Sequence, residues 1–447
     1  MAKATKKRAP PQQRRPPFDC IALLLQGGGA LGAYQAGVYE ALAEANLHPD
    51  WTAGISIGAI NSALIAGNPP EARVEKLREF WRQITTPLPL LSQASEMAMS
   101  AEPTARPDAW QGAYTGNLWK FWERLSSTAF SSSLHGVESQ VVKGDAARGL
   151  FNKLSAARVL MTGAAGFFTP RLPVPWLYPD GTLEATSYYD TGALRATLER
   201  LVDFDRINAA DMRLSMGAVN VRTGNLVYFD NTSHTIRPEH VMASGALPPG
   251  FPAVEIEGER YWDGGLVSNT PLEWVVKSEP KRDTLAFQVD LWSASGEFPR
   301  NLPEVTTRQK EIQYSSRTRV NSDRFKQMQI LRTAVASLLE KLPEELRSLP
   351  EVEMLRPASE HKVYNLVELV YRAQQYEGDS KDYEFSLMSM EDHWRAGYYD
   401  TVRTLQHPEV FERPSSADGV FILDLAQDGH DGYEMASFRR CDTANGE

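Results

Sequence analysis

Cysteine is scarce in this chain of 447 residues, which carries Cys20 and Cys441 near opposite ends and no other. Two such cysteines provide no disulfide framework, so the sequence fits a reducing compartment and predicts a cytoplasmic protein. No uncharged apolar stretch approaches the roughly 18 residues that a membrane-spanning helix needs. The net charge of −10 argues against a nucleic-acid partner. What is left is an ordinary globular composition with ample material for a core.

Acidic residues are missing from the first 17 residues, which are rich in Lys, Arg, Pro and Gln. We predict a disordered basic tail over residues 1–17, because such a composition cannot build a core. The alternative is an electrostatic tether to anionic lipid, which would place the protein peripherally at a membrane. A signal peptide is not expected, because Pro16, Pro17 and Asp19 interrupt the junction with a short apolar run.

The first part of the chain after the tail has the pattern of an α/β protein. Ile21–Leu25 is short, wholly apolar and followed by glycines, which is typical of a buried strand. A helical pattern follows, then a short strand at Trp51–Ile55 and a helix of small residues at Ile57–Ala66. This order of strand, helix, strand, helix predicts a sheet with parallel strands.

The remaining chain divides by composition. Residues 86–136 hold large aromatics among Ser, Ala and Pro, so they either pack on the body or form a cap or lid over an apolar site. Thr284–Trp292 is predicted as a last core strand. Beyond it we expect a mostly helical C-terminal extension over residues 296–447, with amphipathic helices at 361–375 and 393–406 among others. The catalytic domain would then span residues 18–295.

The motif G-x-S-x-G occurs at Gly54–Gly58, between the second predicted strand and its helix. A serine at such a turn, here Ser56, is lifted clear of the sheet, and the N-terminus of the next helix favours an oxyanion. The glycine cluster Gly27–Gly29 ends the preceding strand and can turn its N–H groups toward negative charge. The alternative is a dinucleotide-binding loop with Asp50 on the ribose, but Asp50 precedes the next strand instead of ending it.

A nucleophilic serine needs a base. None of the eight histidines stands in a compelling setting, which weakens a Ser-His-Asp triad without removing it as an alternative. Asp263 is followed by Gly264 and Gly265 in a dense stretch of glycines and prolines, so close approach to the serine is possible there. An unperturbed Asp is a poor base at neutral pH, and the hypothesis therefore requires that Asp263 be buried.

Three blocks, GGGALG at 27–32, GISIG at 54–58 and DGG at 263–265, together resemble the patatin-like phospholipase family. The resemblance implies a three-layer α/β/α fold with a mainly parallel sheet and a helical C-terminal extension. It implies a Ser-Asp dyad of Ser56 and Asp263 without metal or cofactor. It also implies an oxyanion hole formed by Gly27, Gly28, Gly29 and Ile57. The glycines that would support these motifs are Gly32, Gly54, Gly58, Gly264 and Gly265. Many members carry an arginine in the first block, where this chain has Ala30 and Leu31.

The expected function is therefore that of a serine acyl hydrolase acting on lipid, with an apolar acyl pocket beneath residues 86–136. Two alternatives stay open. One is an esterase or thioesterase on other acyl esters, including storage polyesters; the other is a lipid-binding or regulatory protein with little turnover. The sequence makes no prediction of oligomeric state.

Overall fold

The computed structural model describes residues 15–85, 144–359, 362–374, 376–414 and 420–423. The predicted cap or lid at residues 86–136 lies outside the described residues, as does the predicted tail apart from residues 15–17. No helix in the described ranges combines the length and apolarity needed to cross a bilayer.

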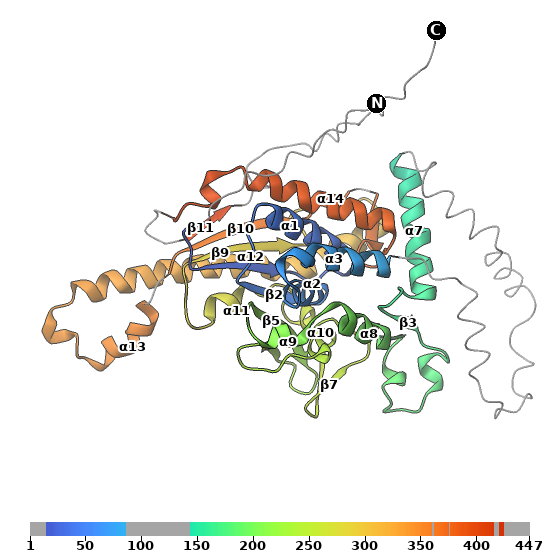
Figure 1. Cartoon of the computed structure of the whole chain (residues 1–447), viewed down its shortest axis with the longest axis horizontal. Helices are drawn as coiled ribbons and strands as arrows, with labels where there is room; N and C mark the ends of the chain where they lie inside the picture. Colours follow the sequence, from blue (N-terminus) through green and yellow to red (C-terminus); the bar gives the residue numbers. More distant parts are fainter. Residues whose placement is uncertain (1–14, 86–143, 360–361, 375, 415–419, 424–447) are drawn as a thin grey trace, which may run out of the picture.

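One mixed sheet forms the centre of the molecule (Figure 1). Its strand order is β11 (Val420–Leu423), β10 (Tyr364–Val370), β9 (Thr284–Asp290), β1 (Cys20–Leu25), β2 (Trp51–Ile55), β5 (Arg213–Asn220), β8 (Glu259–Asp263) and β7 (Val254–Ile256), with β6 (Leu226–Asp230) also paired to β5. The strands from β11 to β5 run parallel, and β6, β7 and β8 pair antiparallel. The predicted α/β class with a mainly parallel sheet is confirmed.

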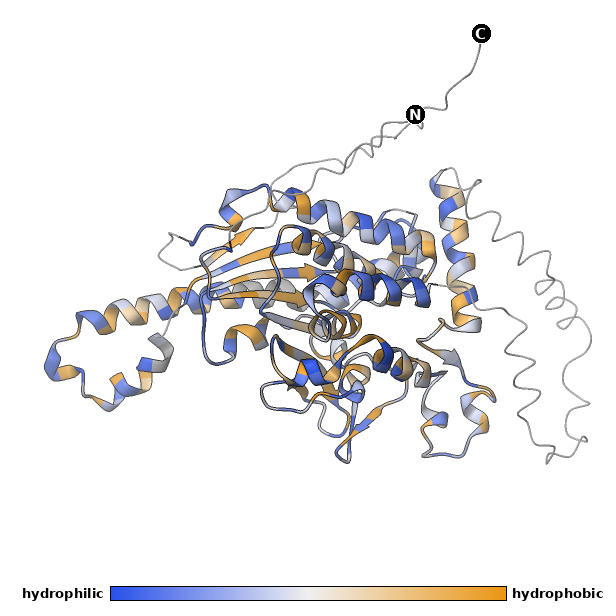
Figure 2. Cartoon of the chain, in the orientation of Figure 1, coloured by the Kyte–Doolittle hydropathy of each residue, from blue (hydrophilic) through white to orange (hydrophobic). Residues whose placement is uncertain are grey.

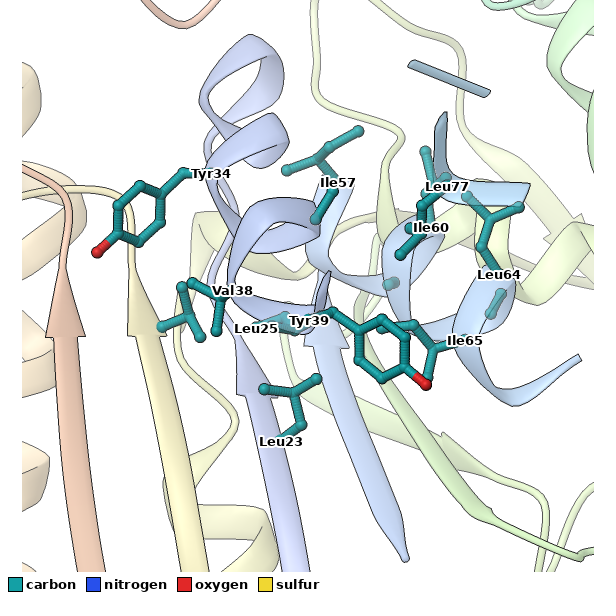
Figure 3. Close-up of a cluster of buried hydrophobic side chains, with 14 of the residues drawn as sticks. Leu23, Leu25, Tyr34, Val38, Tyr39, Ile57, Ile60, Leu64, Ile65 and Leu77 are labelled. Carbon is teal, nitrogen blue, oxygen red and sulfur yellow. The ribbon is translucent and has the colours of Figure 1, made fainter. Parts of the chain in front are cut away.

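Both faces of the sheet are covered, which explains why β1 is apolar throughout. Leu23 and Leu25 point into a large core shared with α1 (Ala33–Glu44), α2 (Ile57–Ala66), α3 (Pro70–Ile84) and α14 (Leu387–Thr404) (Figure 3). Leu24 points to the opposite face, where α11 (Leu272–Lys277) and α12 (Leu302–Lys341) contribute Val275 and Phe325. The result is a three-layer α/β/α arrangement, with the apolar strands at its centre (Figure 2).

The remaining elements frame this body. Short strands β3 (Thr169–Pro170) and β4 (Tyr189–Asp190) pair with each other. The other helices are α7 (Asp145–Thr162), α8 (Gly192–Leu201), α9 (Phe204–Asn208), α10 (Pro238–Ser244) and α13 (Pro350–Ser359). Single 3-10 turns are η1 (Gly29–Gly32), η3 (Pro175–Leu177), η4 (Glu184–Thr186), η5 (Gly264–Leu266), η6 (Glu344–Leu346), η7 (Gly378–Ser380) and η8 (Pro408–Val410).

The C-terminal region is largely helical, as expected, but it is built into the same body as the rest. Helix α14 crosses α1 at two glycines: a Cβ on Gly37 would lie 1.9 Å from the carbonyl oxygen of Trp394, and one on Gly397 would lie 2.0 Å from that of Tyr34. Backbones can approach this closely only where side chains are missing. The first and last described helices therefore pack as one layer.

One predicted helix is wrong. Residues 361–375 contain strand β10, which lies between β9 and β11 in parallel register. Its residues are mostly buried because neighbours cover both faces, and a short apolar run of this kind fits a helix pattern and a buried strand equally well. The prediction of a helix at 393–406 is confirmed by α14, and the strand expected at Thr284–Trp292 by β9.

Candidate active site

Ser56 stands at a sharp turn between β2 and α2. Its backbone angles, φ 57° and ψ −125°, are strained for a residue with a side chain. The flanking glycines make the turn possible by close approach: a Cβ on Gly54 would lie 2.3 Å from the carbonyl oxygen of Gly58, and one on Gly58 would lie 2.2 Å from that of Leu25. This is the strand-to-helix elbow that the G-x-S-x-G spacing predicts.

A second serine braces this turn. The N–H of Ser56 donates to the hydroxyl oxygen of Ser244 over 3.0 Å, and that hydroxyl donates to the carbonyl of Gly217 over 2.7 Å. Ser244 is fully buried at the end of α10. The two bonds fix the strained turn against strand β5, so the position of Ser56 depends on a residue to which the sequence analysis gave no role.

Asp263 ends β8 and lies beside Ser56. Its carboxylate accepts the N–H of Gly265 over 2.7 Å and a hydrogen bond from the Ser56 hydroxyl. The side chain is almost completely buried, and this burial raises the pKa of Asp263 to about 6, although both hydrogen bonds lower it. Gly264 allows β8 to come this close, because a Cβ there would lie 2.5 Å from the carbonyl oxygen of Gly217.

The glycine loop closes the other side of the serine. Gly29 adopts a left-handed conformation, φ 56°, at the start of η1. The N–H groups of Gly28 and Gly29 have no backbone acceptor within the described residues, whereas that of Ala30 donates to the carbonyl of Asp382 over 2.8 Å. Gly32 packs against Ile57, since a Cβ on Gly32 would lie 2.6 Å from the Ile57 side chain. The loop therefore adjoins the N-terminus of α2, where the first N–H groups lack partners within the helix.

Gly27 differs from the other glycines of the loop. Its N–H donates to the carbonyl of Asn269 over 3.4 Å. This N–H is therefore already hydrogen-bonded, although the sequence predicts it as an oxyanion donor. Its carbonyl accepts the Asn269 side-chain amide and the Trp292 indole N–H, each over 3.0 Å. Asn269 and Trp292 thus hold the loop from outside, and the sequence analysis missed both.

Gln26 is a further residue that the sequence analysis missed. It is a fully buried polar side chain at the end of the apolar strand β1, and its side-chain carbonyl oxygen accepts the backbone N–H groups of Leu291 over 2.6 Å and Trp292 over 3.1 Å. A buried amide requires hydrogen-bond partners. The position of a single glutamine between an apolar strand and a glycine loop could therefore have indicated that Gln26 has a structural role.

The serine, the aspartate and the glycine loop open into one pocket of about 310 Å³. Its outer wall is aromatic: Phe167, Phe168, Tyr189, Phe251 and Phe385 contact one another through their rings. The predicted location beneath residues 86–136 lies outside the described residues. The wall that is described comes from four separate chain segments, and an apolar ligand portion such as an acyl chain fits it.

The C-terminal region contributes part of this pocket. Tyr314, Asp382, Tyr383 and Phe385 all line it. The loop that carries Asp382 is clamped to α12, because Lys310 pairs with the Asp382 carboxylate at 2.8 Å and Lys381 pairs with Glu311 at 2.7 Å. The same loop contacts the glycine loop through Ala30, so α12 and the 378–385 segment support the site directly.

The alternatives considered from the sequence find less support. No histidine lines the described pocket. Asp50 accepts the backbone N–H of Ile21 over 2.8 Å and pairs with Arg15, so it ties the start of β1 and does not face a nucleotide crevice. Within the described residues no cluster of His, Cys, Asp and Glu has the arrangement of a metal site. Ala30 and Leu31, which stand in the block where many members of the resembled family carry an arginine, are both buried in the core.

Taken together, the fold and the site define an α/β protein with a serine elbow beside a buried aspartate. Comparison with known families agrees: residues 23–275 match the model described as Patatin-like phospholipase, and residues 312–417 match one described as Patatin phospholipase. Since the first match covers more than half of the chain, the protein belongs to the patatin-like phospholipase family.

Comparisons with individual proteins are more distant. No curated protein matches the chain. Among solved structures, VipD from Legionella pneumophila is 14 % identical, with a TM-score of 0.34 over 94 % of this chain and 77 % of that one. The heterodimeric ExoU–SpcU complex from the type III secretion system of Pseudomonas aeruginosa is 16 % identical, with a TM-score of 0.31 over 88 % of this chain and 52 % of that one.

Proposed function

We propose that the protein is a lipid acyl hydrolase that uses Ser56 as nucleophile and Asp263 as general base. Membership of the patatin-like phospholipase family supports acyl hydrolysis of lipid at the family level. The observation that carries the finer proposal is the contact of the Ser56 hydroxyl with a buried carboxylate whose pKa is raised to about 6. Such a carboxylate is about nine-tenths ionised at pH 7 and is a stronger base than an exposed aspartate.

The proposed reaction has two halves. The Ser56 oxygen attacks the ester carbonyl carbon while its proton passes to Asp263, and the tetrahedral intermediate then collapses with transfer of that proton to the departing alcohol. In the second half, Asp263 takes a proton from water, which attacks the acyl-enzyme, and returns it to Ser56 as the carboxylic acid leaves. One carboxylate thus moves every proton, and no second base is required.

The oxyanion formed in each half needs donors. We propose the N–H groups of Gly28 and Gly29 and that of Ile57 at the start of α2, and we leave Gly27 out because its N–H is already engaged. A donor of this kind typically contributes about 3 kcal/mol to transition-state stabilisation. The aromatic wall of the pocket would hold the acyl chain, which favours an ester of a fatty acid over a small polar ester.

A fluorophosphonate probe tests the dyad, because it labels only an activated serine. Wild type should label, Ser56→Ala should not, and Asp263→Asn should label at least a hundredfold more slowly. Ser278→Ala, at the end of α11, is the matched control and should label like wild type. Labelling that persists without Ser56, or that is absent from wild type, would contradict the dyad. It would favour the alternative of a lipid-binding protein with little turnover. A panel of phospholipids, simple esters and thioesters then decides among the ester classes.

A further inference from the structure

Helix α7 has two apolar faces, only one of which is buried. Phe151, Ala156 and Val159 pack inward. On the opposite side Leu150, Leu154, Ala157 and Met161 recur at spacings of four, three and four residues, so they form a single stripe along the helix. The three large side chains of this stripe are 60 %, 45 % and 44 % exposed, respectively. A contiguous exposed apolar surface of this kind is typical of a site of interaction with another molecule or a membrane.

A second exposed apolar group lies on the same flank of the molecule. Leu172, Trp176 and Leu177, in the turn between β3 and β4, are 58 %, 73 % and 60 % exposed. Figure 1 shows β3 at the lower end of α7, against which it packs, and the turn continues from β3. An exposed tryptophan among leucines is typical of a surface that lies at a membrane–water boundary.

The elements that carry the two groups also reach the pocket through other residues. Leu160 of α7 lines the pocket, and its carbonyl accepts the hydroxyl of Tyr189 over 2.8 Å. The N–H of Tyr188 donates to the carbonyl of Pro249, another rim residue, over 3.0 Å. The helix and the turn that carry the exposed apolar groups are therefore both tied by hydrogen bonds to residues of the pocket.

Two basic residues, Lys153 and Arg158, belong to helix α7 on this flank. The third basic residue of the helix, Arg148, is largely buried and pairs with Asp392 at 2.9 Å, so it is not part of this surface. The helix carries a single acid, Asp145, and the segment 171–178 carries none. By helical geometry Lys153 and Arg158 flank the apolar stripe on its two sides. Basic side chains beside an apolar stripe suit a helix that lies on anionic lipid, with the charges at the headgroups and the stripe below them.

We propose that the flank formed by the outer face of α7 and residues 172–177 is a docking surface for an anionic lipid bilayer. It would set the pocket mouth against the lipid layer, so that an acyl chain passes from the bilayer to the aromatic wall without crossing water. This inference rests on the proposed function, because it gives the pocket a substrate that is presented as a membrane.

Vesicle binding tests the surface apart from catalysis. The probe is large unilamellar vesicles of phosphatidylglycerol and phosphatidylcholine, and binding is measured by co-sedimentation in the Ser56→Ala background, where the lipid stays intact. Leu150→Ser with Leu154→Ser should weaken partitioning at least tenfold, because two leucines leave the apolar contact. Lys153→Gln should weaken binding to the anionic vesicles and leave binding to pure phosphatidylcholine unchanged.

The matched control is Leu346→Ser with Met354→Ser, which removes two exposed apolar side chains, 42 % and 81 % exposed, from η6 and α13 at the other end of the molecule. It should bind vesicles as before. Equal binding by the Leu150/Leu154 variant and this control would overturn the proposal. So would a dimer in sedimentation velocity that the Leu150/Leu154 variant dissociates, since the occupant would then be a second copy.

Hydrolysis of a water-soluble ester separates the two proposals. With Ser56 present, the Leu150/Leu154 variant should hydrolyse p-nitrophenyl butyrate at the wild-type rate and lose rate only on vesicles. Retained vesicle binding by a wild-type protein that hydrolyses no ester would refute the proposed function and leave the docking surface standing. Loss of soluble-ester hydrolysis by the variant would refute the docking surface, because the leucines would then be part of the site.

Discussion

The ionisation of Asp263 should destabilise the folded protein, and Asp263→Asn should reveal by how much. The pKa of this carboxyl rises from 3.8 to about 6 on folding because it is buried. Its contribution to stability is fully present below pH 3.8 and is lost as the pH rises through about 6. A difference of about two pKa units corresponds to about 3 kcal/mol in all. Asparagine has the same shape and no charge, so it escapes this loss.

The measurement is urea unfolding of wild type and Asp263→Asn between pH 5 and pH 8. Part of the stabilisation is already lost at pH 5. The free energy of unfolding of Asp263→Asn minus that of wild type should therefore increase by about 1 kcal/mol from pH 5 to pH 8. Ser56→Ala is the control: it is equally inactive but keeps the carboxyl and loses a hydrogen bond that lowers its pKa. Because the pKa of Asp263 rises further without that hydrogen bond, Ser56→Ala should lose at least as much stability as wild type between pH 5 and pH 8. A difference between wild type and Asp263→Asn that is constant with pH would refute the assignment of a raised pKa.

Three further results are expected. Because Asp263 must be ionised to act as base, kcat/KM for p-nitrophenyl butyrate should rise with pH through about 6 and then level off; a flat profile from pH 5 to pH 8 would contradict the dyad. Lys310→Gln removes the ion pair that holds Asp382 against the glycine loop, so fluorophosphonate labelling should slow several-fold. The circular dichroism spectrum should stay unchanged. Unchanged labelling would show that this ion pair is dispensable. Phe251→Ala opens the aromatic wall, so chain-length preference among p-nitrophenyl esters should move toward longer acyl groups; an unchanged preference would place the acyl chain elsewhere.

The parts of the site that the sequence predicts are those that depend on local geometry. Ser56, Asp263 and the glycine loop each follow a strand and precede a turn or helix, and such motifs can be identified in a short stretch because the backbone there has few choices. The structure brings the three together around one pocket. The hydrogen bonds of Gly27 could not be predicted in this way, because its N–H and its carbonyl both bond to Asn269, a residue more than two hundred positions away.

The aromatic wall and the C-terminal clamp could not be predicted, because no periodicity links their members. Phe168, Phe251 and Phe385 meet only after three chain segments have packed around the sheet. The sequence pattern does not distinguish strand β10 from a helix, because its partners on both sides, β9 and β11, are distant in sequence. Composition separates the region after residue 295 from the rest, whereas hydrogen bonding and strand pairing join it to the core.

The contacts between the C-terminal region and the core also help to hold the glycine loop of the candidate active site in place. The glycine loop at 27–29 leads into η1 and α1, and Asn269, Trp292 and the carbonyl of Asp382 hold it from distant parts of the chain. Asp382 in turn depends on Lys310 of α12. A left-handed Gly29 is a conformation that the chain leaves easily unless its surroundings fix it. The C-terminal region therefore forms part of the pocket wall and holds the glycine loop through Asp382, and a change on α12 outside the pocket lining should slow fluorophosphonate labelling before it lowers the stability of the fold.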